Sequence, residues 1–149
     1  MKFNQITEIV GDTPCMSNRQ GKLIYDLIID NDITQILELG MAHGTGSNYM
    51  AAALEEKGNG LVISIDNQTA KTRVPSIQDM LNKTNLHKYV QPIFANSSYN
   101  WELMKLIEKN TVNGVCTPQF DFYSWNVLLI IVRILLMHYI GICNTNLYV

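Results

Sequence analysis

Two acidic residues and a glycine-rich segment are the parts of this sequence best suited to chemistry. Glu38 stands near the end of an apolar run, and the loop that follows contains Gly40, Gly44 and Gly46. Asp66 ends a second apolar run, LVISID. Glycine lets a backbone turn sharply and approach a ligand without a Cβ in the way. Because a carboxylate at a strand end can accept hydrogen bonds from ribose hydroxyls, the pattern predicts a small-molecule site.

A strand, a turn and a helix must position these residues. The β-branched run predicts a strand over about 33–39, the helix-compatible segment after the loop predicts a helix over about 47–57, and LVISID predicts a buried strand over 61–66. This spacing is typical of a βαβ unit in a mainly parallel sheet. Such a unit sets a helix N-terminus beside the carboxyl end of a strand, where α/β sheets bind ligands.

The N-terminal flank predicts one helix after an irregular lead-in over residues 1–16. Ser17 or Asn18 is suited to cap a helix that runs to about residue 30. We expect four apolar side chains to share its buried face, namely Leu23, Ile24, Leu27 and Ile28.

The C-terminal flank predicts a helix over about 76–85 and a third strand over about 89–95, which Pro92 places at an edge or a bulge. A helix capped by Ser97 or Ser98 follows, and we expect a core-facing stripe of Trp101, Met104 and Ile107 on it. A fourth strand is predicted to begin at Phe120.

Length and composition indicate one ordinary globular domain. The chain has 149 residues, 47% of them hydrophobic and 16% charged, with a net charge of −2, so no basic excess points to nucleic acid. Its three cysteines have neither disulfide-framework nor zinc-site spacing, and we predict no metal site. This cysteine usage makes a reduced, cytoplasmic setting the expectation. The N-terminus has one Lys followed by polar residues rather than an apolar core, so we do not expect it to be a signal peptide.

Two common nucleotide motifs fit the loop poorly. A P-loop requires a lysine directly after its second glycine, and no lysine occurs between Gly40 and Lys57. A dinucleotide fingerprint starting at Gly44 meets Tyr49 where the third glycine belongs. A nicotinamide-dependent oxidoreductase nevertheless stays open as an alternative, because Asp66 would serve a dinucleotide ribose equally well.

The combination of ILELGMAHGTGS with VISID resembles the first two motifs of class I S-adenosylmethionine-dependent methyltransferases. The resemblance extends over about residues 12–122 and implies a three-layer, Rossmann-like α/β fold with S-adenosylmethionine as cofactor. It implies that Glu38 orients the methionine end, that Asp66 holds the ribose and that Asn96 and Ser97 lie beside the adenine. The loop backbone would pack against the cofactor, through Gly40, Met41, Ala42, His43 and Gly44.

Plainer roles stay open for several of these residues. Glu38 is also suited to capping the neighbouring helix, and Asp66 to being a solvated residue at a strand end. His43 is suited to lining the loop or to acting as a base. Tyr99 and Trp101 are suited to stacking on the adenine. Methyl transfer mainly requires donor and acceptor to be held in line, so no catalytic residue or methyl acceptor is assigned.

The last 28 residues have a different composition. No Asp, Glu or Lys occurs over 122–149, and the resemblance stops there, so the sheet is expected to be incomplete at its C-terminal side. Residues 127–143 read as a membrane segment, as a strand or helix that completes a shortened domain, or as a shifted reading frame. Arg133 argues against a membrane span, and the abrupt change favours the frame shift. The nucleotide sequence around codons 118–126 would test it. A non-catalytic product with a self-associating or membrane-adhering tail is the remaining alternative.

Overall fold

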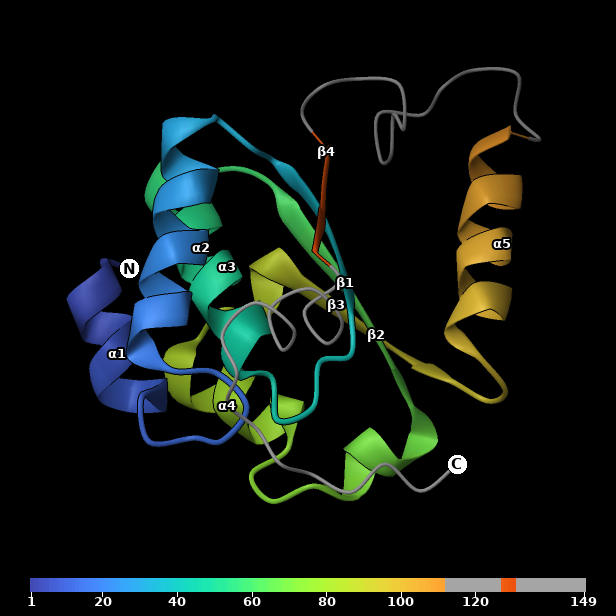
Figure 1. Cartoon of the computed structure of the whole chain (residues 1–149), viewed down its shortest axis with the longest axis horizontal. Coiled ribbons are helices and arrows are strands. Elements are labelled where there is room, and N and C mark those ends of the chain that lie inside the picture. Colours follow the sequence, from blue (N-terminus) through green and yellow to red (C-terminus); the bar gives the residue numbers. More distant parts are fainter. Residues whose placement is uncertain (112–126, 131–149) are drawn as a thin grey trace.

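A parallel sheet forms the middle of the molecule. The computed structural model describes residues 1–111 and 127–130. Within them the sheet has four strands in the order β3 (Val90–Ala95), β2 (Leu61–Asn67), β1 (Gln35–Leu39) and β4 (Val127–Ile130), and each neighbouring pair is parallel (Figure 1). The mainly parallel sheet and its first three strands are thus confirmed, and Pro92 lies on the strand at one end of this order.

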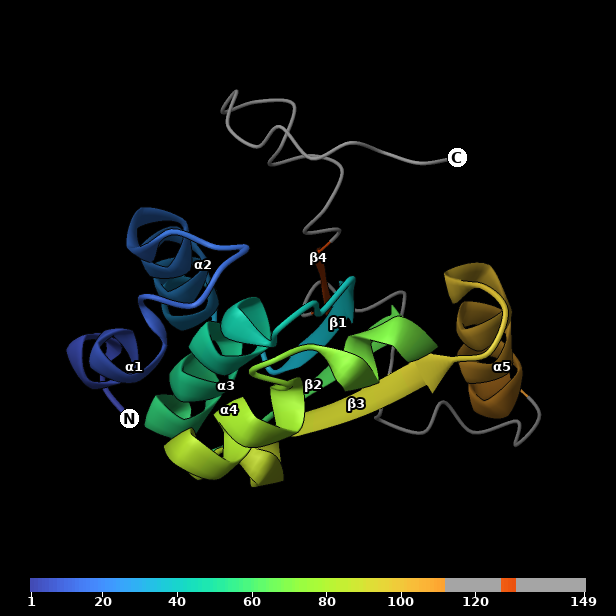
Figure 2. The same cartoon turned by 90° about the horizontal axis from the view of Figure 1, so that it is seen from below.

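Helices cover both faces of the sheet, which gives the three layers that the sequence predicted. One face is covered by the layer of α1 (Phe3–Val10), α2 (Asn18–Asp30), α3 (Thr45–Lys57) and α4 (Ile77–Thr84), in which α3 lies next to the strands, and the other is covered by α5 (Tyr99–Thr111) (Figure 2). The alternation of strand side chains explains this division. Ile36 and Val62 belong to the first apolar cluster, whereas their neighbours Leu37 and Ile63 belong to the second.

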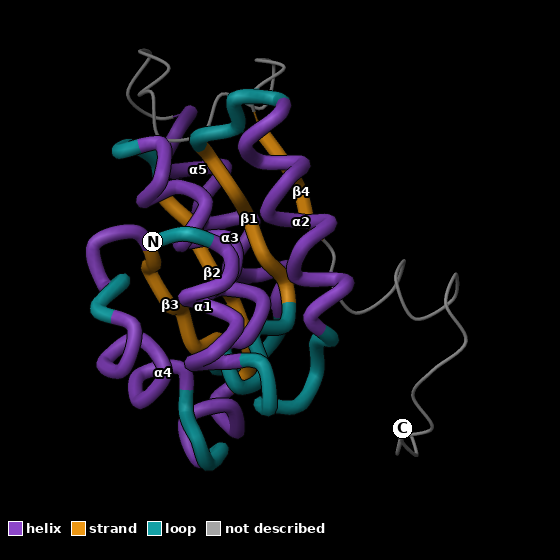
Figure 3. The backbone as a smooth tube through the Cα atoms, turned by 90° about the vertical axis from the view of Figure 1, so that its left-hand side faces the viewer, coloured by secondary structure: helices purple, strands orange, loops and turns teal. Residues whose placement is uncertain are grey.

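The central helix is α3, whose residues from Thr45 to Leu54 are all buried. It lies between the sheet and the other helices of its layer. Figure 3 shows the molecule from the side of this helix layer. A helix buried on all sides needs no amphipathic stripe, and small residues such as Ala51, Ala52 and Ala53 allow close packing. It begins at Thr45, two residues earlier than predicted.

The helix predicted over 18–30 is confirmed, but its predicted buried face is only half right. Ser17 is the N-cap and accepts a hydrogen bond from the backbone of Gln20. Ile24 and Ile28 are buried, whereas Leu23 and Leu27 are 61% and 41% exposed. The reason is that α2 turns the Gly21–Ile24–Ile28 side toward α3, where a Cβ on Gly21 would lie 2.5 Å from the Tyr49 ring.

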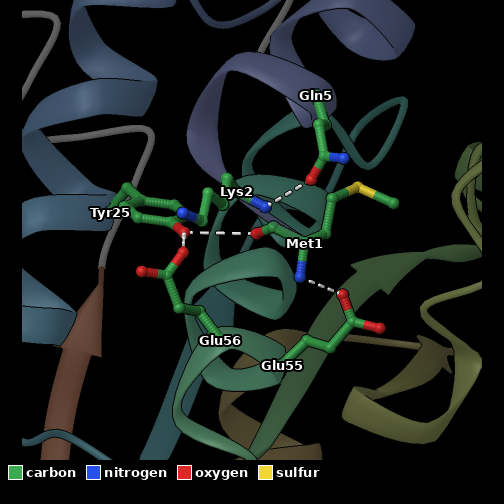
Figure 4. Close-up of polar contacts among 6 residues, drawn as sticks. All are labelled: Met1, Lys2, Gln5, Tyr25, Glu55 and Glu56. Atoms are coloured by element: carbon green, nitrogen blue, oxygen red, sulfur yellow. Dashed lines mark hydrogen bonds and ion pairs between the residues drawn. The ribbon is translucent and has the colours of Figure 1, made fainter.

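The N-terminal segment is not irregular, as the sequence analysis expected, because α1 occupies most of it. Ile6 and Val10 are fully buried, one helical turn apart, and the Phe3 ring stacks on the Tyr49 ring at 5.5 Å between centroids. Polar contacts join this end to α2 and α3 (Figure 4): the Tyr25 hydroxyl bonds to the Met1 carbonyl and to Glu56, and the Met1 amine pairs with Glu55. Lys2 N–H donates to the Gln5 side chain at 2.9 Å.

The helix α5 presents a different side to the sheet from the one predicted. Trp101 and Met104, expected in the core, are 53% and 59% exposed, and the side chain of Ile107 lies outside the described residues. Leu103 and Leu106 pack against the sheet instead, together with Tyr99. The stripe at i, i+4 and i+7 from Tyr99 therefore carries the packing.

Most of the C-terminal expectations lie outside the described residues. This holds for the strand predicted from Phe120 and for the interpretations of residues 122–149, of which only β4 is described. The register aligns Gln35 with Val127 and Glu38 with Ile130. In the described ranges no helix is long and apolar enough to cross a membrane.

Candidate functional site

The loop between β1 and α3 lies where an open parallel sheet usually binds ligands. The chain runs from β1 to β2 to β3 on one side, whereas β4 lies on the other side of β1. The strand order therefore changes direction at β1, and ligands of α/β sheets bind beyond the carboxyl ends of the strands at such a point. Residues 40–44 connect that end of β1 to the N-terminus of α3.

Left-handed backbone angles shape this loop. Gly40, Ala42 and Gly44 have φ values of 91°, 51° and 83°. The Gly40 N–H donates to the Ile65 carbonyl at 2.8 Å, which ties the loop to β2, and the Gly44 N–H donates to the Met41 carbonyl at 2.7 Å. The sharp turn predicted from the glycines is therefore present, and Ala42 shares the left-handed conformation without being a glycine.

Two of the glycines are required by internal packing. A Cβ on Gly44 would lie 2.7 Å from Cγ1 of Ile77, at the start of α4. A Cβ on Gly46 would lie 2.8 Å from Oε1 of Glu38. The space into which a Cβ would point at these two residues is thus filled by the protein's own side chains.

Glu38 is buried beneath the N-terminus of α3. Its Oε2 accepts hydrogen bonds from the hydroxyls of Ser47 on α3 and Ser64 on β2. Burial raises the pKa of Glu38 from 4.5 to about 7; the two serine donors oppose this rise, and the nearby charge of Asp66 adds to it. Glu38 therefore changes its protonation state near neutral pH.

Asp66 is also buried, at 3% exposure, rather than a solvated residue at a strand end. Its Oδ2 accepts the Ala42 N–H at 2.8 Å, so the carboxylate holds the loop in its left-handed turn. Its Oδ1 accepts the Asn67 N–H at 2.8 Å and the Tyr99 hydroxyl at 3.0 Å. The structure thus brings the ends of β1 and β2 and the start of α5 together around this carboxylate.

His43 occupies the loop and is half-buried. Its Nδ1 lies 2.7 Å from the Pro75 carbonyl oxygen. A carbonyl oxygen only accepts hydrogen bonds, so Nδ1 carries the proton and Nε2 is the ring nitrogen available to a ligand.

Asn96 and Ser97 are exposed in the turn between β3 and α5. Gln68, in the short 3-10 helix η1 (Gln68–Thr72), donates from Nε2 to Asn96 Oδ1 at 2.7 Å and to the Phe94 carbonyl at 2.8 Å. This contact fixes the Asn96 side chain between the ends of β2 and β3. Of the two proposed caps, Ser98 accepts the hydrogen bond from the Trp101 N–H.

Sequence reasoning missed two side chains of this site, Ser47 and Ser64, and it considered a third, Tyr99, for stacking on adenine rather than for the hydrogen bond that it donates to Asp66. Ser64 carried a signal, because it is a polar residue inside the apolar run LVISID on the same face as Asp66. Ser47 carried none, and no signal indicated that Tyr99 bonds to Asp66, since both contacts depend on how α3 and α5 pack on the sheet.

Comparison with known proteins finds solved structures with a similar fold. No protein-family model and no curated protein matches the sequence. An O-methyltransferase from Bacillus cereus, solved with SAH, matches 72% of the chain with a TM-score of 0.55 and 17% identity over 47% of its own length. The O-methyltransferase TomG from Streptomyces achromogenes, solved with SAM, matches 76% with a TM-score of 0.53 and 20% identity over 48%.

A putative caffeoyl-CoA O-methyltransferase from Staphylococcus aureus matches 69% of the chain with a TM-score of 0.52 and 22% identity over 48% of its length. The chain therefore spans about half the length of these solved structures. At such identities the likeness establishes the fold, which is the Rossmann-like α/β fold predicted from the sequence.

Proposed function

We propose that this chain binds S-adenosylmethionine and forms the cofactor-binding part of a class I methyltransferase. The observation that carries the proposal is the pair of buried carboxylates, Glu38 and Asp66, which end neighbouring strands on either side of a loop with left-handed turns. The likeness to O-methyltransferases solved with SAM or SAH supports it. By analogy with those proteins, a hydroxyl oxygen is the proposed methyl acceptor.

The residues present fit the chemistry of this cofactor. Asp66 retains an acceptor position for a ribose hydroxyl, and the fixed Asn96 side chain with Ser97 offers polar groups for the adenine. Glu38, which titrates near neutral pH, is suited to balance the ammonium group of the methionine end. When bound, the cofactor supplies an activated methyl group; the role of the protein is to orient that group and to exclude water.

The loop backbone supplies the remaining part of the proposed site. Gly40, Met41, Ala42, His43 and Gly44 follow β1 directly, and Asp66 holds the turn through Ala42. No residue of this set is assigned a catalytic proton transfer. Nε2 of His43 is the nitrogen that a base role would use.

The nicotinamide alternative is less well supported. A dinucleotide fingerprint uses its third glycine for close packing of the helix on the strand. Here that position is Tyr49, which is fully buried against α2 and bonds to Asn18 through its hydroxyl at 3.1 Å. The aromatic ring thus serves packing between helices, and the structural neighbours named above are methyltransferases.

Calorimetric titration of the chain with SAH, S-adenosylmethionine and NAD tests the proposal. We expect both adenosyl sulfur ligands to bind and NAD not to bind. Asp66→Asn should abolish binding, and the matched control Asp30→Asn, at an exposed position, should retain it. Because Asp66 also holds the loop, circular dichroism must show that the variant is folded. Binding of NAD alone, or of none of the three ligands to the folded chain, would refute the proposal.

A further inference from the structure

The environment of Asp66 limits what its carboxylate can still accept. A carboxylate has about four lone-pair positions, two on each oxygen. On Oδ1 both are used, by the Asn67 N–H at 2.8 Å and by the Tyr99 hydroxyl at 3.0 Å. On Oδ2 one is used, by the Ala42 N–H at 2.8 Å. Counting the contacts among residues 1–111 and 127–130, one acceptor position is therefore left for a ligand, on Oδ2.

The start of α5 brings the Tyr99 hydroxyl to Oδ1 of Asp66. Tyr99 is the first residue of α5, and Ser98 before it accepts a hydrogen bond from the Trp101 N–H at 3.3 Å. Further along the helix, Leu103 and Leu106 pack against the apolar cluster that contains Ile63 and Ile65. The phenol is thus presented by a helix that is anchored to the sheet.

We infer that Tyr99 is a positioning residue that restricts Asp66 to a single ribose hydroxyl of the nucleoside ligand. This inference rests on the proposed function and deepens it. A carboxylate with both oxygens open would accept both ribose hydroxyls, as the sequence analysis expected. With the phenol in place, the second hydroxyl of the ribose faces an oxygen whose acceptor positions are filled.

The test measures binding of SAH and of its 2′-deoxy and 3′-deoxy analogues by calorimetry. In the unmodified chain we expect removal of one hydroxyl to weaken binding about tenfold or more, the effect of losing a hydrogen bond to a charged group, and removal of the other to change it by less than about threefold. In Tyr99→Phe, which frees a position on Oδ1, removal of the second hydroxyl should also weaken binding about tenfold.

A matched control separates this effect from a loss of structure. Tyr25→Phe also removes a phenol that bonds to a carboxylate, that of Glu56, but it does so between α2 and α3 near the N-terminus (Figure 4). It should leave the ratio between the two deoxy analogues unchanged. A merely structural role of Tyr99 would weaken all three ligands by the same factor.

The outcomes distinguish this inference from the proposed function. If SAH binds but both deoxy analogues bind equally weakly to the unmodified chain, Tyr99 does not restrict the carboxylate. An unchanged ratio in Tyr99→Phe would overturn the inference as well. If SAH does not bind to the folded chain at all, the proposed function itself fails, and the inference fails with it.

Discussion

Glu38 couples the candidate site to pH. Its pKa in the folded chain is about 7, whereas its ordinary value is 4.5. Between these values the folded chain binds more protons than the unfolded chain, so its free energy of unfolding falls as the pH rises. The stabilisation is fully present below pH 4.5 and is lost as the pH rises to about 7.

We therefore expect Glu38→Gln to flatten the pH dependence of stability. In urea denaturation, the free energy of unfolding of the unmodified chain should fall between pH 5 and pH 8 by about 2–3 kcal/mol more than that of the variant. Glu8→Gln, at an exposed position, is the control and should keep the original pH dependence. An equal change in the free energy of unfolding between pH 5 and pH 8 for Glu38→Gln and for the unmodified chain would show that Glu38 has an ordinary pKa.

Gly44 and Gly58 allow the cost of a left-handed backbone to be measured separately from the cost of a steric clash, because they have the same φ angle but different surroundings. Gly44 and Gly58 both have φ values of 83°, but a Cβ on Gly58 would meet nothing within 4 Å, whereas one on Gly44 would meet Ile77. Gly58→Ala should cost about 1–2 kcal/mol, the price of a left-handed residue with a side chain. Gly44→Ala should cost about 1–3 kcal/mol more, because Ile77 must move. Equal losses in chemical denaturation would mean that Ile77 yields freely.

Those candidate site residues whose positions follow from a general rule of sheet architecture could be predicted from the sequence. Glu38 and Asp66 follow from the rule that strand ends gather at one edge of a parallel sheet. Ser47 and Tyr99 follow from no such rule, because hydroxyl groups on helices reach these carboxylates only through the packing of α3 and α5.

At the scale of elements, α2 shows how packing selects one side of an apolar helix. Ile28 is fully buried and Leu23 is mostly exposed, although both are apolar residues of one helix. Ile28→Ala should lower the free energy of unfolding by about 2–5 kcal/mol, because it leaves a cavity. Leu23→Ala should change it by less than about 0.5 kcal/mol. A loss at Leu23 as large as that at Ile28 would indicate that something covers this side of α2.

The boundaries of the central elements were predictable because their signals are strong. The Ser17 cap, the apolar strands and the glycines at 58 and 60 mark β1, α2, α3 and β2 clearly. The signal of α1 was present but was not used, since Phe3, Ile6 and Val10 recur at helical spacing. Ile6 and Val10 are buried, and the Phe3 ring packs on Tyr25 and Tyr49. The face of α5 was misjudged because large apolar side chains do not by themselves show which stripe packs on the sheet.

At the scale of the whole molecule, the strand order explains why the candidate site lies where it does. The sheet changes direction at β1, and the loop after β1, the end of β2 and the start of α5 meet there. The sequence predicted the strand, helix and strand units, since each has its own periodicity. It did not predict the placement of β4 beside β1, because pairing between distant segments leaves no local pattern. The division of the chain at residue 121 and the cytoplasmic setting stay predictions.

The most direct test of the account is to observe which backbone amides respond to SAH. In ¹H–¹⁵N spectra of the isotopically labelled chain, titration with SAH should shift the amides of Gly40, Ala42 and Gly44 in the loop after β1 and that of Asn67, which bonds to Asp66. The amides of α1 should stay unchanged, because that helix packs on the far side of α3 from the sheet. Shifts confined to α1 and α2, or no shift at saturating SAH, would contradict the assignment of this loop as the cofactor site.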